Sequence, residues 1–194
     1  MTTREKILST ALRLFNEQGI DVITIRHIAK EIGISHSNIQ YYFRNADEII
    51  EAIYTHHISG LNELPAFDGT SLVSLQESIE NILQHIYQYR FIYIHFVTIA
   101  RRIPAIKKVY SQRFIARRAQ LLRIFTGFSA QGIMRNDIPV SVWESLVRNI
   151  YMIGDFWISA NELTTKLKGK KAVEYYAAMI ADVLYPYLAE KGRR

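Results

Sequence analysis

The chain has no cysteine and only four prolines among its 194 residues. Without thiols it can form no disulfide framework, no thiolate metal site and no cysteine nucleophile, and this composition fits a reducing compartment such as the cytoplasm. Long apolar runs are missing too, because the longest nearly apolar stretch, residues 91–100, is interrupted by His95. A membrane helix needs about 20 apolar residues, so we expect neither a membrane span nor a signal peptide.

The common catalytic motifs are also missing. The sequence contains no glycine-rich phosphate loop, no His-Glu-x-x-His and no Gly-x-Ser-x-Gly. His56 and His57 are chain neighbours, so they point to different faces of a helix. We therefore expect no enzyme, no cofactor and no metal site.

What is present is helical periodicity. The hydrophobic fraction is 49%, which suits an all-α fold with a small N-terminal domain, residues 1–46, and a larger helical domain, residues 47–194. Apolar spacing and breaker residues predict about nine helices, at residues 2–18, 24–32, 34–43, 45 onward, 72–89, 91–102, 105–130, 141–161 and 171–185. A loop is predicted over residues 60–70, which contain Pro65, Asp68 and Gly69.

Two short helices beginning after Thr24 and Ser35 have strongly marked starts. Each cap residue follows an isoleucine and precedes another at the staple position, and Gly33 can end the first helix with a positive φ. In the second helix only Ile39 and Phe43 are strongly apolar, and the remaining faces carry hydrogen-bonding side chains. This pattern is typical of a DNA-binding helix-turn-helix. The alternative interpretation is a solvated helix surface, which polar rows usually form.

Residues 4–54 resemble the DNA-binding head of the TetR/AcrR family of bacterial transcriptional regulators. The resemblance rests on four stretches: Ile7-Leu8…Ala11…Leu14-Phe15…Gly19, Thr24-Ile25-Arg26-His27-Ile28-Ala29, Gly33-Ile34-Ser35 and Asn38-Ile39-Gln40-Tyr41-Tyr42-Phe43. It implies a homodimer that binds a double-stranded DNA operator, usually as a repressor, and releases it when a small molecule occupies the C-terminal helical domain.

The resemblance also implies roles for single residues. Bases would be contacted by Arg26, His36, Ser37 and Gln40, and phosphates by Thr24, Asn38, Tyr41 and Tyr42, with Ser35 as the cap of the same helix. Three positions depart from the family pattern: Ser37 often is Gly there, Gln40 often is Tyr, and Ala46 replaces a phosphate-contacting Lys. Arg44 is near enough to take over that contact, and the operator sequence does not follow by analogy.

The net charge of +6 does not lie in the head. Residues 1–50 hold six Lys or Arg and six Asp or Glu, whereas residues 101–123 hold eight basic residues and no acid. Such a run is usually a solvated face. The alternative is that Arg101, Arg102, Lys107 and Lys108 create a field that steers DNA or an anionic effector.

The last two long helices are apolar on more than one side and need more partners than one small domain offers. They predict a two-fold homodimer through four helices, two from each subunit. The expected interface consists of Leu146, Ile150, Ile153, Trp157, Tyr176, Ile180, Val183, Leu184 and Tyr187.

An effector would bind in the aromatic middle of the chain, although most rings there are expected simply to fill the core. The sequence suggests a small hydrophobic or aromatic effector between helices. Its expected contacts are Tyr89, Tyr93, Phe96, Phe114, Phe125, Tyr151, Asp155 and Trp157.

The main hypothesis is thus a cytoplasmic, ligand-released transcriptional repressor that binds a palindromic operator as a homodimer. The competing hypothesis is a helical module that binds a small molecule or a protein and reads no bases. The neutral head keeps that second hypothesis open.

Overall fold

The computed structural model describes residues 1–65 and 71–193, and these residues form ten α-helices and two short 3₁₀ helices. The only β interaction among them is an isolated bridge between Met134 and Leu188. The all-α prediction is confirmed. The helices group into two compact units, one of Met1–Glu63 and Gln88–Val109 and the other of Leu64–Tyr87 and Tyr110–Arg194.

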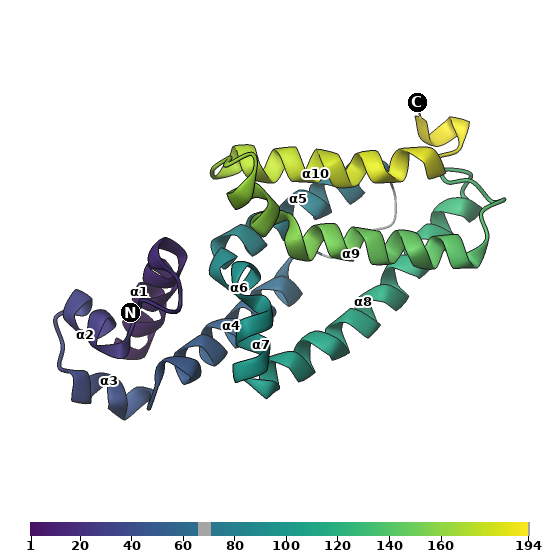
Figure 1. Ribbon diagram of the computed structural model, residues 1–194. Coiled ribbons are helices and arrows are strands. Elements are labelled where there is room, and N and C mark those ends of the chain that lie inside the picture. Colours follow the sequence, from purple (N-terminus) through teal and green to yellow (C-terminus); the bar gives the residue numbers. More distant parts are fainter. Residues whose placement is uncertain (66–70, 194) are drawn as a thin grey trace. The chain divides into compact units, whose positions relative to one another are not determined.

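Unit 1 begins with the head. Its helices are α1 (Thr3–Gln18), α2 (Ile25–Ile32), α3 (His36–Tyr42), α4 (Ala46–Glu63), α6 (Arg90–Ile94) and α7 (Phe96–Arg102). Figure 1 shows α1, α2 and α3 grouped together, with α4 leading away from α3 toward α6 and α7. One hydrophobic core joins residues of α1 to α4, such as Ile7 and Ile49, with Phe91, Ile99 and Ile106. The compact unit that holds the head therefore extends well past residue 46.

Asn16 of α1 ties the head to the start of α6. Its side-chain amide donates to the carbonyl of Gln88 at 2.8 Å, and its side-chain oxygen accepts from the backbone N–H of Phe91 at 3.0 Å. Tyr89, the residue before α6, makes no side-chain cap of its own. Asn16 thus caps α6 from another helix, and the Phe15 and Phe91 rings, with centroids 5.2 Å apart, pack beside it.

Unit 2 contains the remaining helices: most of α5 (Leu72–Gln88) and of α8 (Pro104–Ala130), then α9 (Val140–Leu163), α10 (Lys170–Leu184), η1 (Tyr185–Tyr187) and η2 (Glu190–Arg193). Its core holds Leu75 of α5, Phe125 and Phe128 of α8, and Trp143 and Leu146 of α9. α9 and α10 also pack against each other. The apolar faces of these helices therefore pack largely against one another within the protomer.

The predicted loop at residues 60–70 begins too early. α4 continues through Gly60 to Glu63. A helix tolerates one interior glycine at a cost of about 1 kcal/mol, whereas a proline disfavours helix at the residue before it. Pro65 therefore ends α4, because it disfavours the helical conformation at Leu64. Asp68 and Gly69 lie outside the described residues.

The single helix predicted over residues 91–102 is two helices. His95 separates α6 from α7 with φ −107° and ψ 17°. Its imidazole packs against Gly19, where an added Cβ would lie 3.4 Å from Nε2. Hydrogen bonds continue on both sides of the break, because the His95 N–H donates to the Phe91 carbonyl and the Ile99 N–H donates to the His95 carbonyl. The break is a kink in an otherwise helical path.

Membrane-spanning helices and metal-binding clusters are both absent from the described residues. No helix there is both long and apolar enough to cross a membrane. No cluster of three or more His, Cys, Asp or Glu side chains suited to hold a metal ion occurs in the same part of the chain.

Candidate nucleic-acid interface

The turn between α2 and α3 is built as the sequence predicts. Thr24 caps α2 and Ser35 caps α3, where the Asn38 N–H donates to the Ser35 hydroxyl at 3.1 Å. Gly33 adopts φ 71° and ψ 31°, the left-handed conformation, and its N–H donates to the Ala29 and Lys30 carbonyls. Because both helix ends are fixed by local hydrogen bonds, the angle between α2 and α3 is set within three residues.

Two apolar side chains hold α3 to the head. Ile39 is fully buried and Phe43, the C-cap, is 4% exposed. The guanidinium carbon of Arg4 lies 5.3 Å from the centre of the Phe43 ring and covers it. With α3 anchored one turn apart at these points, its other faces have to point outward.

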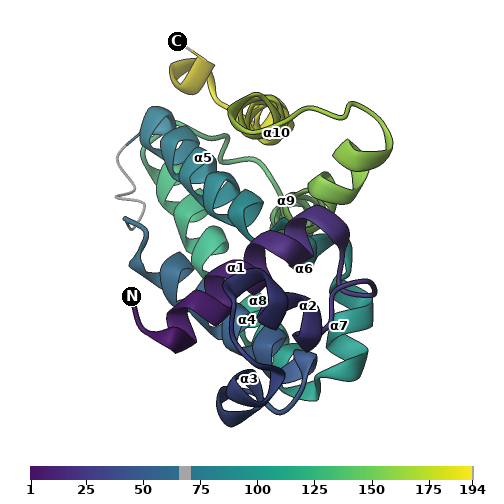
Figure 2. The same cartoon turned by 90° about the vertical axis from the view of Figure 1, so that its left-hand side faces the viewer.

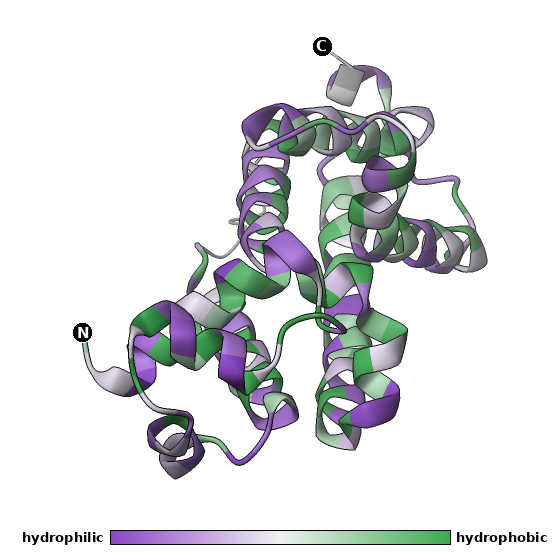
Figure 3. Ribbon diagram, turned by 60° about the vertical axis from the view of Figure 1, so that its left-hand side comes forward, coloured by the Kyte–Doolittle hydropathy of each residue, from purple (hydrophilic) through white to green (hydrophobic). Residues whose placement is uncertain are grey.

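Most residues of α3 are polar, and its ribbon is coloured toward the hydrophilic end of the scale in Figure 3. Ser37, Asn38, Gln40 and Tyr41 are exposed, and 83% of Tyr41 is accessible. The Ser35 and Ser37 hydroxyls are 2.9 Å apart. Serine, amide and phenol groups can each accept or donate a hydrogen bond, as contact with base edges requires.

The full set of predicted DNA-contacting residues lies on α2, α3 and the segments next to them. Nine are exposed and His36 is half-buried; the exposed ones are Thr24, Arg26, Ser35, Ser37, Asn38, Gln40, Tyr41, Tyr42 and Arg44. The rings of Tyr41 and Tyr42 meet edge to face, with centroids 5.1 Å apart. These side chains share one small part of the head, although contact with DNA stays a prediction.

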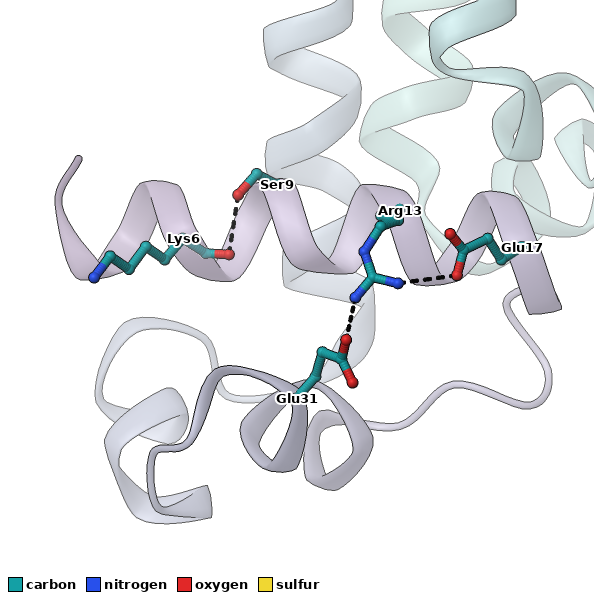
Figure 4. Close-up of polar contacts among 5 residues, drawn as sticks. All are labelled: Lys6, Ser9, Arg13, Glu17 and Glu31. Atoms are coloured by element: carbon teal, nitrogen blue, oxygen red, sulfur yellow. Dashed lines mark hydrogen bonds and ion pairs between the residues drawn. The ribbon is translucent and has the colours of Figure 1, made fainter.

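The orientation of α2 depends on α1 as well. Arg13 of α1 donates to Glu17 at 3.0 Å and also to Glu31 of α2 (Figure 4). In the same view the Ser9 hydroxyl donates to the Lys6 carbonyl at 3.2 Å. All three charged side chains are about half exposed, so these ion pairs add little free energy. Of the two pairs, only Arg13–Glu31 joins α1 to α2, since Arg13–Glu17 lies within α1.

The start of α4 carries acidic side chains that are already engaged. The Glu48 carboxylate accepts the backbone N–H of Arg44 at 2.8 Å, and the Glu48 N–H donates to the Asn45 side chain at 3.0 Å. Asp47 is paired with Arg102, which comes from the last turn of α7. Sequence reasoning did not place Arg102 next to α4, because no local pattern links residues 55 positions apart.

The residues predicted to bind an effector are divided between the two compact units. Tyr89, Tyr93 and Phe96 belong to unit 1, and the other five belong to unit 2. In unit 1 the Tyr93 hydroxyl is 2.9 Å from Nε2 of the buried His57. The His57 ring also packs against Tyr89, with centroids 4.7 Å apart and the ring planes tilted by 44°. Burial raises the pKa of Tyr89.

Three of the predicted effector residues in unit 2, Phe114, Tyr151 and Asp155, lie where side chains of α8 and α9 meet. The Tyr110 hydroxyl, which the predicted set leaves out, donates to the Asp155 carboxylate. The Phe114 and Tyr151 rings pack edge to face with centroids 5.0 Å apart. Burial raises the pKa of Asp155 above its ordinary 3.8 and raises the pKa of Tyr151 to about 12. Removing charge from water is the cause in both cases.

Two other members of that predicted set are core residues. Phe125 is 1% exposed and packs against Trp143, with centroids 5.5 Å apart. Trp157 is 1% exposed between Tyr87 and Tyr176. The indole N–H of Trp157 has no hydrogen-bond partner among the described residues. These two rings fill the interior of unit 2.

The predicted dimer residues divide into two groups. Five are at most 5% exposed within the protomer: Leu146, Trp157, Tyr176, Ile180 and Leu184. They have little surface left to bury against a second chain, and the expected interface stays a prediction. The half-buried members are Ile150, Ile153, Val183 and Tyr187. The larger exposed apolar side chains of the same helices are Met152, Phe156 and Leu163 of α9 and Tyr175 and Met179 of α10.

Family models match nearly the whole chain. Residues 7–53 match the model for bacterial regulatory proteins of the tetR family, and residues 53–194 match the TetR model described as a bacterial transcriptional repressor. The chain belongs to the TetR family. The matched regions meet at residue 53, inside α4, so the TetR assignment covers both the head and the helices that follow it.

Individual TetR-family proteins are similar to the chain at modest identity. The HTH-type transcriptional regulator AcrR of Shigella flexneri is 31% identical over an 87-residue alignment that covers 42% of this chain and 40% of AcrR. SrpR of Pseudomonas putida, also an HTH-type transcriptional regulator, is 20% identical over 99% of this chain and 78% of its own. The match to AcrR thus spans about two-fifths of that relative.

A solved structure supports the fold over the full length. A TetR-family transcriptional regulator from Marinobacter aquaeolei VT8 has a TM-score of 0.86 and 24% sequence identity to this chain. The comparison covers 100% of this chain and 95% of the other. The fold of both units is therefore one that a TetR-family regulator adopts.

Proposed function

We propose that this TetR-family chain binds a palindromic DNA operator as a homodimer and represses transcription until a small molecule releases it. The observation that carries the proposal is the exposed polar side of α3, anchored from behind by Ile39 and Phe43. An α-helix fits the major groove of B-DNA, and a tight turn behind it positions its first residues at base edges.

Within that interface, residues are assigned by their chemistry and their place in the family pattern. Arg26, His36, Ser37 and Gln40 contact bases, whereas Thr24, Asn38, Tyr41 and Tyr42 contact phosphates. Arg44 adds a further cation at the end of α3. Residues 1–46 are the DNA-binding domain in this proposal, and residues 47–194 bind the effector and the second subunit.

The dimer contact is assigned to the outward faces of α9 and α10. Met152 and Phe156, one turn apart on α9, are 63% and 59% exposed, and Tyr175 on α10 is 50% exposed. Exposed apolar side chains in one stripe are typical of a subunit interface. The half-buried Ile153 and Val183 border these faces and complete the contact.

The effector site is assigned to the group of Tyr110, Phe114, Tyr151 and Asp155 in unit 2. A half-buried carboxylate beside aromatic rings suits a hydrophobic or aromatic ligand that also carries a hydrogen-bond donor. Retaining an ionisable group with a raised pKa at an apolar position disfavours folding, and such groups often occur at binding sites.

The remaining assignments follow from the role. A repressor needs no catalytic residue and no cofactor, and TetR-family proteins are transcriptional regulators. The protein would act in the cytoplasm, where its DNA target lies and where a chain without cysteine is at no disadvantage.

The proposal is tested by selection of protein-bound fragments from host chromosomal DNA at two salt concentrations. Phosphate attraction weakens steeply with salt, whereas base contacts retain their preference. A palindromic motif that persists at the higher salt is the expected result. Weak binding without a motif that disappears at higher salt would contradict the proposal and favour a protein-contact module.

A further inference from the structure

The DNA-binding head lacks the positive charge that DNA binding usually requires. Residues 1–50 contain as many acidic as basic residues, six of each. One of the basic residues, Arg13, is already paired with two carboxylates. Neutralising phosphates with Lys and Arg supplies much of the affinity of DNA-binding proteins. Other cations in the same unit are therefore candidates for this role.

Such cations lie at the junction of α7 and α8, which belongs to unit 1 with the head. We call Arg101, Arg102, Lys107 and Lys108 the basic corner; all four are exposed. The orientation of residues 99–108 is fixed, because Ile99, Ile103 and Ile106 are at most 6% exposed in the core shared with α1 to α4. Their burial directs the four cations to solvent.

The basic corner is tied to the segment that follows α3. Arg102 pairs with Asp47 in the first turn of α4, five residues after the end of α3. Both side chains are more than one-third exposed, so the pair lies at the surface. Asp47 unpaired would repel phosphate, and Arg102 offsets that charge. Figures 1 and 2 agree that the end of α7 lies at the same end of unit 1 as α3.

We propose that the basic corner contacts the phosphate backbone of the duplex that α3 binds. The partner is the DNA backbone, recognised by charge and without sequence preference. Arg101 and Lys108 supply direct contacts, and Arg102 neutralises Asp47 at the start of α4. This inference rests on the proposed function, since it adds a second contact surface to the same DNA complex.

The experiment compares Arg101→Gln/Lys108→Gln with the wild type by measuring DNA affinity as a function of salt. The slope of log K against log salt is negative, and each lost phosphate contact makes it less steep by about 0.9, so the slope of the double variant is less steep by about 1.8 per protomer. The loss is the same on the selected operator and on a scrambled duplex. Both side chains are exposed, so thermal unfolding is expected to stay unchanged.

The matched control is Lys168→Gln/Lys171→Gln, which removes the same charge from exposed positions in unit 2. If contact with phosphates, and not the net charge of the protein, sets the slope of log K against log salt, the slope of this control stays at the wild-type value. An equal loss of slope in both double variants, or an unchanged slope in the first, would overturn the inference.

A second pair of variants tests the ion pair. Asp47→Asn removes the acid beside the DNA and tightens binding several-fold at low salt, whereas Arg102→Gln exposes it and weakens binding by a similar factor. Identical affinities for these two variants contradict the role of the pair. A wild-type protein that selects no motif defeats the proposed function, while the slope on any duplex still tests the basic corner.

Discussion

Single residues in this molecule connect segments that the sequence leaves far apart. Asn16 of α1 caps α6, and the Asp155 carboxylate of α9 accepts a hydrogen bond from the Tyr110 hydroxyl of α8. No local pattern predicts either contact, because both partners of each are ordinary residues until the chain has folded. Each contact leads to a measurable expectation.

Replacing Asn16 by Ala removes a donor and an acceptor at the junction of α5 and α6. We expect the free energy of unfolding to fall by about 1–2 kcal/mol, as for the loss of a helix cap. Denaturant unfolding measures this change. Asn136→Ala, at an exposed position, is the control and changes stability by less than about 0.5 kcal/mol. Equal stabilities for the two variants would show that the Asn16 bridge is not formed.

Asp155 should make stability depend on pH. Its pKa is raised in the folded protein by burial, so the folded protein binds the proton more tightly than the unfolded chain does. Stability from this group is present below the ordinary pKa of 3.8 and is lost as the pH rises through the folded pKa. Asp155→Asn is therefore expected to raise Tm at pH 7, and the gain shrinks as the pH falls toward 3.8.

The control variant is Asp137→Asn, for which the expected change in Tm at pH 7 has the opposite sign. Asp137 is exposed, and its hydrogen bonds from Arg135 at 2.9 and 2.7 Å lower its pKa. Asp137→Asn should give no gain at pH 7 and a slight loss. A gain in Tm for Asp155→Asn that is the same at pH 4 and pH 7 would mean that the ionised carboxylate carries no penalty.

At the scale of elements, local signals predicted best where each helix end is fixed by its own neighbours. The caps Thr24 and Ser35 and the left-handed Gly33 were all predicted and are all present. Signals failed where packing decides. Gly60 does not stop α4, and His95 kinks a helix that apolar spacing made continuous.

The candidate sites follow the same rule. The exposed side of α3 could be predicted because only two of its residues are apolar enough to be buried. Which apolar residues of α9 are buried within the protomer could not be predicted, because α9 is apolar on several sides and sequence does not show which side packs against α10. Leu146 and Trp157 pack inside the protomer, and Met152 and Phe156 remain outside. The predicted effector residues stay a prediction, since aromatic content does not distinguish core from pocket.

The turn between α2 and α3 gives an element-scale prediction. Gly33→Ala has open space for its Cβ but keeps φ at 71°, so it should destabilise the protein by about 1–2 kcal/mol through backbone strain. Gly127→Ala in α8 also has open space, with no positive φ, and should stabilise by about 0.5–1 kcal/mol. Denaturant unfolding of both variants measures these changes. A change of the same sign in the free energy of unfolding of both variants would contradict the positive φ assigned to Gly33.

At the scale of the whole molecule, the proposal requires two chains acting on one operator. Phe156→Glu places a charge in the exposed apolar stripe of α9 and should convert the dimer to a monomer in sedimentation velocity. Losing the second head should lower operator affinity about 100-fold or more, because linked sites gain that much from avidity. Ile115→Glu, at a site 68% exposed on α8, is the control and should stay dimeric. A wild-type monomer at micromolar concentration would rule out this arrangement.

The central claim is that the exposed side of α3 reads bases. The most direct measurement is DNA selection carried out in parallel with the wild type and with Gln40→Ala. The account predicts a palindrome for the wild type, and for the variant the same half-site spacing with preference lost at one position in each half. Identical motifs for the two proteins, or no motif for the wild type, would contradict it.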